Sequence, residues 1–191
     1  MRDLDGYNIS MRITDKKFFT QNVEDLAKSL LGKILCVKDE CDNIKRAIIV
    51  EVECYEGETD SASHCYRGKT ERNKIMYYQG GHTYIYLCYG IHWLLNITSG
   101  LENQPQGVMI RGICDVLEKS KPMYGPGKVT KHLGLDKSYN SENLTTSNRI
   151  WLENNKAIKP PIEIEYFPRV GIDYALPEDR EKLWRFRLKD I

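Results

Sequence analysis

Two carboxylates stand at the end of an apolar run near the first quarter of the chain. Residues 47–50 are all apolar, and Glu51, Glu53 and Tyr55 follow at alternate positions. Alternate side chains of a β-strand point to the same face, so these three would share one face. A carboxylate at the end of a strand covered on both faces would be desolvated, and the resulting rise in pKa suits a general base. The periodicity alone leaves open a solvated strand face with no chemistry.

Basic residues gather in the segment that follows. Residues 67–74 hold four basic side chains against one acid, and we expect Arg67, Lys69 and Arg72 to contact a nucleic-acid backbone. Lys128 and Lys131 form a second group beside residues 125–127, a glycine-rich segment whose amides could bind a phosphate where a helix begins. An ordinary solvated helix start would also produce such runs.

A third pattern is aromatic. Residues 83–89 and 91–98 are β-prone runs that meet at Gly90, which predicts a hairpin with Tyr84 and Tyr86 on one face. Tyr89 would then project from the tip, where an exposed ring can wedge between base pairs and fill the space of an extruded nucleotide. The alternative is that these tyrosines only pack a sheet.

Two polar residues interrupt otherwise apolar strands. Asn96 falls in the run 91–98, and Arg111 falls in a predicted strand over residues 107–114. A buried Asn or Arg costs free energy unless it is paired, so each is either a structural partner or a residue of a binding pocket.

Taken together, these segments resemble the alkyladenine (3-methyladenine) DNA glycosylase family. The family pattern V-E-T-E-A-Y matches residues 50–55, H-x-Y-R-G-x-T-x-R-N matches residues 64–73, and Y-x-Y-x-x-Y-G-x-x-x-x-x-N matches residues 84–96. A G-P-x-K-L pattern resembles residues 125–129, and closing P-R-[IV]-G-I-D and W-R-F patterns match residues 168–173 and 184–186. The likeness covers nearly the whole chain with its motifs in order, although Val52 and Cys54 replace Thr and Ala.

The resemblance implies a role for each matched residue. Glu53 would be the base that activates a water, with Arg111 helping to hold both. The flipped base would be enclosed by Tyr55, His64 and Tyr86, with Asn96 acting as a steric gate against the amino group of normal guanine. Tyr89, next to Gly90 at the hairpin tip, would be the intercalating wedge.

The resemblance also implies a reaction. A methylated purine carries a positive charge and leaves readily, so one carboxylate and one water suffice where other sugar hydrolases use two acids. We expect a monofunctional enzyme without a cofactor or metal, acting as a monomer on duplex DNA that contains damaged purines. Its expected substrates are 3-methyladenine and 7-methylguanine, with hypoxanthine and ethenoadenine as further candidates.

The elements that must position these residues indicate an α+β fold. An amphipathic helix is predicted over residues 22–32, a short helix from Thr70 to Tyr78, and another helix over residues 125–134. Predicted strands span residues 33–38, 46–55, 83–89, 91–98, 107–114, 149–153, 162–167 and 183–188. We therefore expect residues 17–191 to form a single domain after a variable lead-in over residues 1–16. Its curved, open barrel-like antiparallel sheet would be flanked by short helices and carry a protruding hairpin.

Composition indicates a folded protein but does not indicate what it binds. The chain of 191 residues is 41% hydrophobic and 29% charged, as a folded soluble protein would be, and its net charge of +1 gives no global sign of nucleic-acid binding. The six cysteines fit no zinc or redox spacing, so we expect reduced thiols in a cytosolic protein, or a nuclear one in a eukaryote. No apolar run is long enough to span a bilayer.

Three other functions fit some of these features. A nucleic-acid-binding module could use the basic loop and the aromatic hairpin without catalysis, and release of a free base would separate it from an enzyme. A hydrolase of small nucleosides or sugars would need neither of those features. A purely structural domain would not need the ordered set of motifs.

Overall fold

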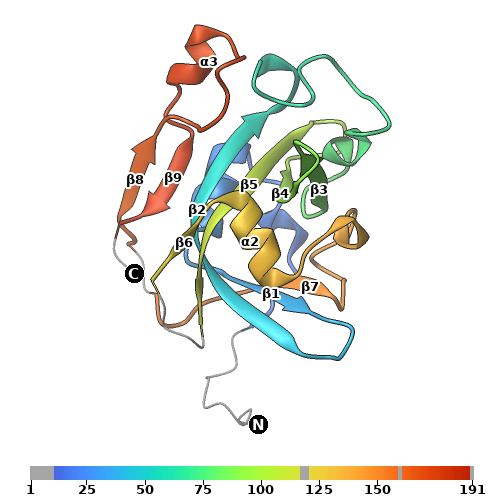
Figure 1. Ribbon diagram of the computed structural model, residues 1–191, viewed down its shortest axis with the longest axis vertical. Helices are drawn as coiled ribbons and strands as arrows, with labels where there is room; N and C mark the ends of the chain where they lie inside the picture. The colour runs from blue at the N-terminus through green and yellow to red at the C-terminus, as the bar shows by residue number, and fades with distance from the viewer. Residues whose placement is uncertain (1–10, 117–120, 159–160, 190–191) are drawn as a thin grey trace.

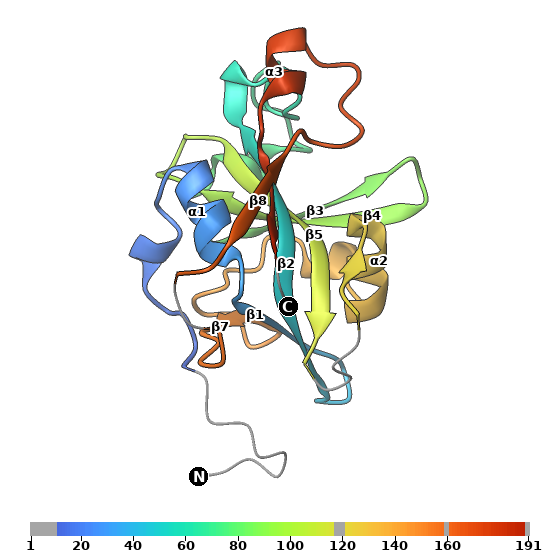
Figure 2. The ribbon, with the colours of Figure 1, turned by 90° about the vertical axis from the view of Figure 1, so that its left-hand side faces the viewer.

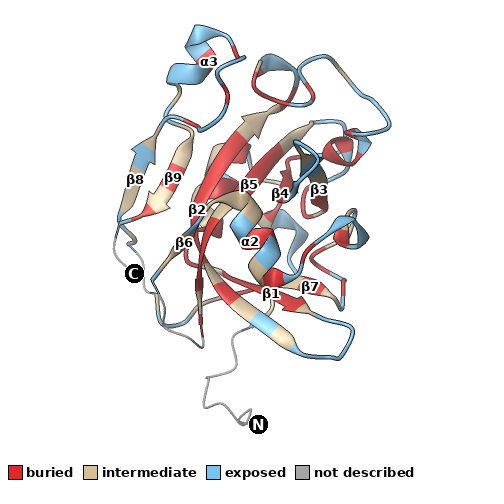
Figure 3. Cartoon of the chain, viewed as in Figure 1, coloured by how far each residue is buried: buried red, intermediate tan, exposed pale blue. Residues whose placement is uncertain are grey.

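One long strand, β2 (Ile44–Glu56), organises the fold. The computed structural model describes residues 11–116, 121–158 and 161–189, and in this part of the chain nine strands form one sheet (Figure 1). β2 pairs along one edge with β5 (Gln106–Asp115). Along its other edge it pairs first with β1 (Ile34–Lys38) and then with β9 (Arg185–Leu188). β2 is therefore the central strand, and Figure 3 shows it buried along most of its length.

The remaining strands extend the sheet on both sides. Its main order is β3–β4–β5–β2–β1–β7, with β3 spanning Thr83–Cys88, β4 His92–Ser99 and β7 Ile150–Glu153. The short β6 (Met123–Tyr124) pairs with β5, and β8 (Ile164–Phe167) pairs with β9. All of these pairings are antiparallel, which confirms the predicted α+β class with an antiparallel sheet.

Helices cover the two sides of the central strands. In Figure 2, α1 (Val23–Leu30) lies on one side of β2 and β5, and α2 (Pro126–Leu133) lies on the other. The side chain of Asn22 caps α1 by accepting a hydrogen bond of 2.9 Å from the Asp25 amide. Gly134 ends α2 in the left-handed conformation, with φ of +73°. The sequence predicted both helices.

Two helical segments differ from the prediction. The helix expected from Thr70 to Tyr78 is wrong: the chain forms turns and a single 3₁₀ segment, η3 (Lys74–Tyr77). The side chain of Asn73 accepts a hydrogen bond from the Thr70 amide and donates to the carbonyls of His64 and Gly68, so it holds a loop instead of a helix. Conversely, α3 (Pro177–Glu181) was not predicted, although Pro177 begins it and two acidic residues follow, as in many helix starts.

The β3–β4 hairpin extends outward from the rest of the sheet in Figure 2. Cys88 pairs with His92, and the turn between them places Tyr89 and Gly90 at positive φ, +50° and +70°. Glycine adopts this conformation freely, whereas a tyrosine adopts it at a cost in free energy. The turn leaves the Tyr89 side chain 89% exposed.

The described part of the lead-in packs on the sheet. The backbone of Arg12 forms an isolated antiparallel β-bridge with Glu153 of β7. The Arg12 guanidinium donates hydrogen bonds to the carbonyls of Leu144 and Ser147. Ile13 is buried in the main core. Within the described ranges, no helix is long and apolar enough to cross a lipid bilayer.

Candidate active site

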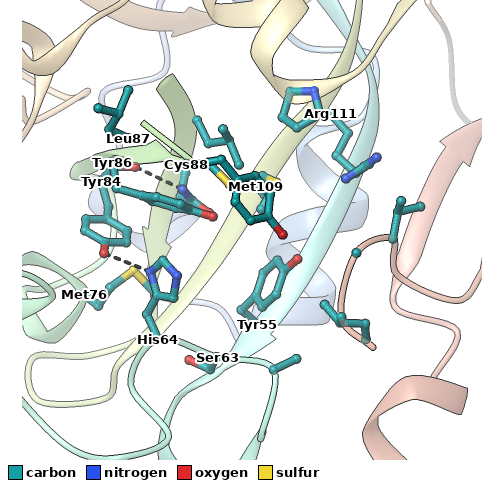
Figure 4. Close-up of a pocket in the computed structure, with 18 of the residues that line it drawn as sticks. Tyr55, Ser63, His64, Met76, Tyr84, Tyr86, Leu87, Cys88, Met109 and Arg111 are labelled. Carbon is teal, nitrogen blue, oxygen red and sulfur yellow. Dashed lines mark hydrogen bonds between the residues drawn. The ribbon is translucent and has the colours of Figure 1, made fainter. Parts of the chain in front are cut away.

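Four neighbouring strands present one row of side chains to a cavity of about 490 Å³. Tyr84 of β3 lies opposite Asn96 of β4, Asn96 opposite Met109 of β5, and Met109 opposite Glu53 of β2. The residues two positions farther along three of these strands, Tyr86, Arg111 and Tyr55, line the same cavity. Alternation along each strand therefore builds the pocket. Figure 4 shows the rings of Tyr55, Tyr84 and Tyr86 around it.

An aromatic group forms one wall. The rings of Tyr84 and Tyr86 lie 5.4 Å apart, and the His64 ring contacts Tyr86 edge-on at 4.4 Å. The Nδ1 atom of His64 is 3.1 Å from the Tyr84 hydroxyl, an interaction drawn in Figure 4. Desolvation against these rings, together with the nearby Arg72 charge, lowers the pKa of His64, which makes it a neutral imidazole at physiological pH.

Glu53 lies behind the opposite wall and is fully buried. Its Oε1 accepts a hydrogen bond of 2.8 Å from the amide of Val170. Its Oε2 accepts one of 2.9 Å from the Tyr55 hydroxyl and one of 3.3 Å from the Arg111 guanidinium. Tyr55, Arg111 and Val170 all line the cavity, so the carboxylate lies directly behind this wall, within one hydrogen bond of three residues that line the cavity.

Burial dominates the titration of this acid. Desolvation raises the pKa of Glu53 above its ordinary value, while Arg111, the Val170 amide, Tyr55 and Arg185 act in the opposite direction by stabilising the anion. A carboxylate with these properties can accept a proton from a water near neutral pH.

Glu51, the other acid of this strand, is engaged differently. Its Oε1 accepts hydrogen bonds of 2.9 Å from both Arg185 and Arg187 of β9. Two guanidinium groups therefore neutralise Glu51, which is not among the residues that line the cavity. These two ion pairs give Glu51 a structural role between β2 and β9.

Asn96 and Arg111 are both pocket residues and structural partners. The side-chain amide of Asn96 donates a hydrogen bond of 3.1 Å to the Tyr84 carbonyl, and its side chain reaches the cavity floor. Arg111 lines the cavity while it pairs with Glu53. The two alternatives that the sequence left open thus coexist at each position.

The residues expected to meet DNA lie on the rim and beyond it. Tyr89 contributes to the cavity rim, next to the exposed Gly90. Arg72 also lines the cavity, with its guanidinium 5.9 Å from the Tyr86 ring. The other basic residues of the two groups are exposed: Arg67, Lys69, Lys128 and Lys131.

The segment that follows β8 contributes cavity residues that no pattern in the sequence indicated. This segment supplies Val170, Gly171, Ile172 and Tyr174 to the cavity. The Tyr174 hydroxyl donates a hydrogen bond of 2.9 Å to the Ala62 carbonyl, which fixes the segment across from the hairpin. The P-R-V-G-I-D motif was the only available signal, because an amide donor leaves no trace in the residue type.

The sequence matches one family of known proteins. Residues 17–191 match the sequence profile of the family described as methylpurine-DNA glycosylase. A protein of Borreliella burgdorferi (strain ZS7) named "Putative 3-methyladenine DNA glycosylase" is 40% identical over 181 residues, which cover 92% of this chain and 96% of the relative. Proteins of the same name from Clostridium novyi (strain NT) and Clostridioides difficile (strain 630) are 37% and 36% identical. The matches cover 94% and 92% of this chain, and 96% and 100% of those relatives.

Proposed function

The chain belongs to the methylpurine-DNA glycosylase family and is a DNA glycosylase of DNA repair, and from that premise we propose how it selects and releases a base. In this proposal the enzyme extrudes a methylated purine from duplex DNA into the aromatic pocket. A water activated by Glu53 then cuts the N-glycosidic bond. The observation that carries the proposal is a buried carboxylate held by three groups that themselves line a cavity large enough for a purine.

The pocket suits a cationic purine. Its volume of about 490 Å³ lies in the range of small-ligand sites. Methylation at N3 or N7 gives the purine a positive charge, which the faces of Tyr55 and Tyr86 attract more strongly than they attract a neutral base. The lowered pKa of His64 keeps its ring uncharged, so the imidazole does not repel this cation.

Glu53 supplies the chemistry. A carboxylate oxygen can accept two hydrogen bonds, and Oε1 uses one for the Val170 amide, so its second lone pair can hold the water. The water oxygen forms a bond to C1′ of the sugar, its proton passes to Glu53, and the electrons of the glycosidic bond leave with the base. The carboxylate also stabilises the positive charge that develops on the sugar ring, and Arg111 favours the ionised form of the carboxylate.

The rim prepares the substrate. Extrusion of a base costs a few kcal/mol, and an aromatic ring that replaces it in the stack contributes roughly 1–3 kcal/mol. Tyr89 has the exposure and the position for this wedge. Asn96 would oppose the amino group of normal guanine from the floor, and Arg67, Lys69, Arg72, Lys128 and Lys131 would bind phosphates.

Release of a free base tests the proposal. Purified protein is incubated with methylated duplex DNA, and free 3-methyladenine is measured alongside strand breaks before and after alkali. We expect free base and alkali-dependent breaks, because hydrolysis by water leaves an intact abasic strand. A panel with 7-methylguanine, hypoxanthine and ethenoadenine defines the range.

Two variants make the assay specific. Glu53→Gln should reduce release at least ~100-fold, whereas Glu142→Gln, which changes an acid paired with Arg149 outside the cavity, should not alter it. If Glu53→Gln releases the base as fast as the unaltered protein, Glu53 is not the base.

A further inference from the structure

A buried ion pair lies directly behind the pocket wall. The side chains of Arg169 and Asp60 are both fully buried, and the guanidinium binds the carboxylate through two hydrogen bonds of 2.6 and 2.9 Å. Neither residue lines the cavity. A pair in this geometry is costly to desolvate and is retained only where its hydrogen bonds are well satisfied.

The same guanidinium also ties three segments together. It donates a hydrogen bond of 2.8 Å to the Cys54 carbonyl in β2 and one of 3.1 Å to the Asp179 carbonyl in α3. Its carbon atom Cζ lies 4.9 Å from the centre of the Tyr55 ring and 5.1 Å from that of Trp184. Arg169 thus connects β2, the segment after η2 (Gly57–Thr59) and α3 from the inside.

These contacts bracket the catalytic carboxylate. Cys54, whose carbonyl Arg169 binds, lies between Glu53 and Tyr55 in the chain. Val170, whose amide binds Glu53, is the neighbour of Arg169 on the other side. A displacement of Arg169 would therefore move an amide donor of Glu53 and the packing of Tyr55 together.

We propose that the Arg169–Asp60 pair is a positioning element for base excision, which holds the Val170 amide on Glu53 and the Tyr55 ring against the pocket. The inference rests on the proposed function of Glu53 and goes beyond it, because it assigns a catalytic consequence to two residues that touch neither base nor water. A pair that served stability alone would have no effect on the acid.

Charge-conserving variants separate positioning from electrostatics. The groups that face Glu53 from the surrounding elements are Tyr55, Tyr86, Arg111, Arg169 and Arg185. Asp60→Asn would leave Arg169 unpaired among them and change the local charge. Arg169→Lys keeps the positive charge but loses the planar guanidinium that binds the carboxylate through two hydrogen bonds. Asp60→Glu keeps the negative charge and lengthens the acidic side chain by one methylene.

The experiment compares single-turnover base release across pH for these two variants and for two controls. Arg149→Lys is the chemical control, since Arg149 pairs with Glu142 at 3.0 Å and stacks on Tyr139 at 4.1 Å, but lies outside the residues that line the cavity. Leu152→Ala, in the fully buried part of β7, is the stability control. Each protein is assayed well below its own unfolding midpoint.

We expect Arg169→Lys to lower the plateau rate by roughly 10- to 100-fold, as small misplacements of catalytic groups do. Loss of the Val170 hydrogen bond removes a group that stabilises the anion, so the acidic limb of the pH–rate profile should move to higher pH. The dissociation constant for a duplex containing a reduced abasic analogue should change by less than about threefold, since neither side chain lines the pocket. Asp60→Glu should lower the plateau rate and move the acidic limb of the pH–rate profile in the same directions as Arg169→Lys, with smaller changes. If Arg169→Lys does not fold, Asp60→Glu takes its place in the test.

The outcomes distinguish this inference from the function beneath it. If Arg169→Lys and Asp60→Glu match Leu152→Ala, with a lower midpoint but an unchanged rate and acidic limb, the pair is structural and the inference is wrong. That conclusion leaves the function intact as long as Glu53→Gln is inactive in the same assay. If Glu53→Gln is active, the proposed base itself is wrong.

Discussion

The wall that holds Glu53 and the tip of the β3–β4 hairpin are opposite in construction. Glu53 is fully buried and receives hydrogen bonds from β2, β5 and the segment after β8. Tyr89 is 89% exposed. The adjacent Gly90 also borders open space, because a side chain there would meet no atom within 4 Å of its Cβ. One region is fixed from several sides before DNA arrives, and the other offers its side chain entirely to a partner.

Under the proposed function, in which Glu53 is the base and Tyr89 the wedge, the difference follows from the task of each region. A base in a buried site works only if its charge and orientation are fixed in advance, because dipoles that must reorganise during the reaction add to the barrier. A wedge gains its stabilising contacts only inside the DNA, so contacts within the free protein would compete with insertion. Substitutions at the wall should therefore change the chemical step and its pH dependence, and those at the tip should change substrate opening.

The largest effect should come from Glu53→Gln. Loss of the general base is expected to reduce single-turnover base release by roughly 100- to 10,000-fold, while duplex binding is retained. Rapid-quench kinetics and a binding titration with the same duplex measure the two quantities. If the affinity for the duplex falls by the same factor as the rate of base release, the assignment of Glu53 as the general base is contradicted.

Arg111→Met should follow. Arg111 lowers the pKa of Glu53, so its removal raises that pKa further, and base release should fail at a higher pH as the solution is acidified. A hydrogen bond to a charged group contributes about 1.5–3 kcal/mol, which corresponds to a loss of roughly 10- to 150-fold at neutral pH. An acidic limb that stays in place would show that Arg111 does not set the ionisation of Glu53.

Tyr89→Ala tests the other region. Loss of one stacking contact of about 1–3 kcal/mol should slow excision from duplex DNA by roughly 5- to 150-fold without moving the acidic limb. Because the side chain is exposed, the thermal midpoint should not change. Tyr89→Phe keeps the ring and serves as the control, and a lesion opposite a gap, which is already unstacked, should be less sensitive.

The smallest effect is expected at the exposed basic loop. Arg67→Gln should weaken binding of any duplex several-fold and reduce the slope of log affinity against log salt by about one, if Arg67 contacts a phosphate. Neither the pH profile nor the choice of lesion should change. A titration at several salt concentrations measures the slope, and an unchanged slope would place Arg67 outside the interface.

The contrast also explains what the sequence could predict. Alternation is a local property, so it identified Glu53 with Tyr55 and Tyr84 with Tyr86, and the hairpin runs located Tyr89 at a turn. The Val170 amide lies 117 positions from Glu53, and its approach depends on tertiary contacts that no local pattern encodes. The helix expected from Thr70 failed for a local reason, because the Asn73 side chain offers nearby backbone groups alternative hydrogen bonds.

The row that joins Tyr84, Asn96, Met109 and Glu53 restricts how this enzyme can diverge. Inserting or deleting one residue within any of the four strands would turn that strand's pocket residues to the opposite face, and a single event would remove two of them. Evolution can therefore retune lesion preference in the strands only by exchanging side chains in place. The segments 57–73 and 168–176 are not subject to this alternation, but the Arg169–Asp60 ion pair and the Val170 amide fix them at single residues, so a change in chain length there must leave these residues in place.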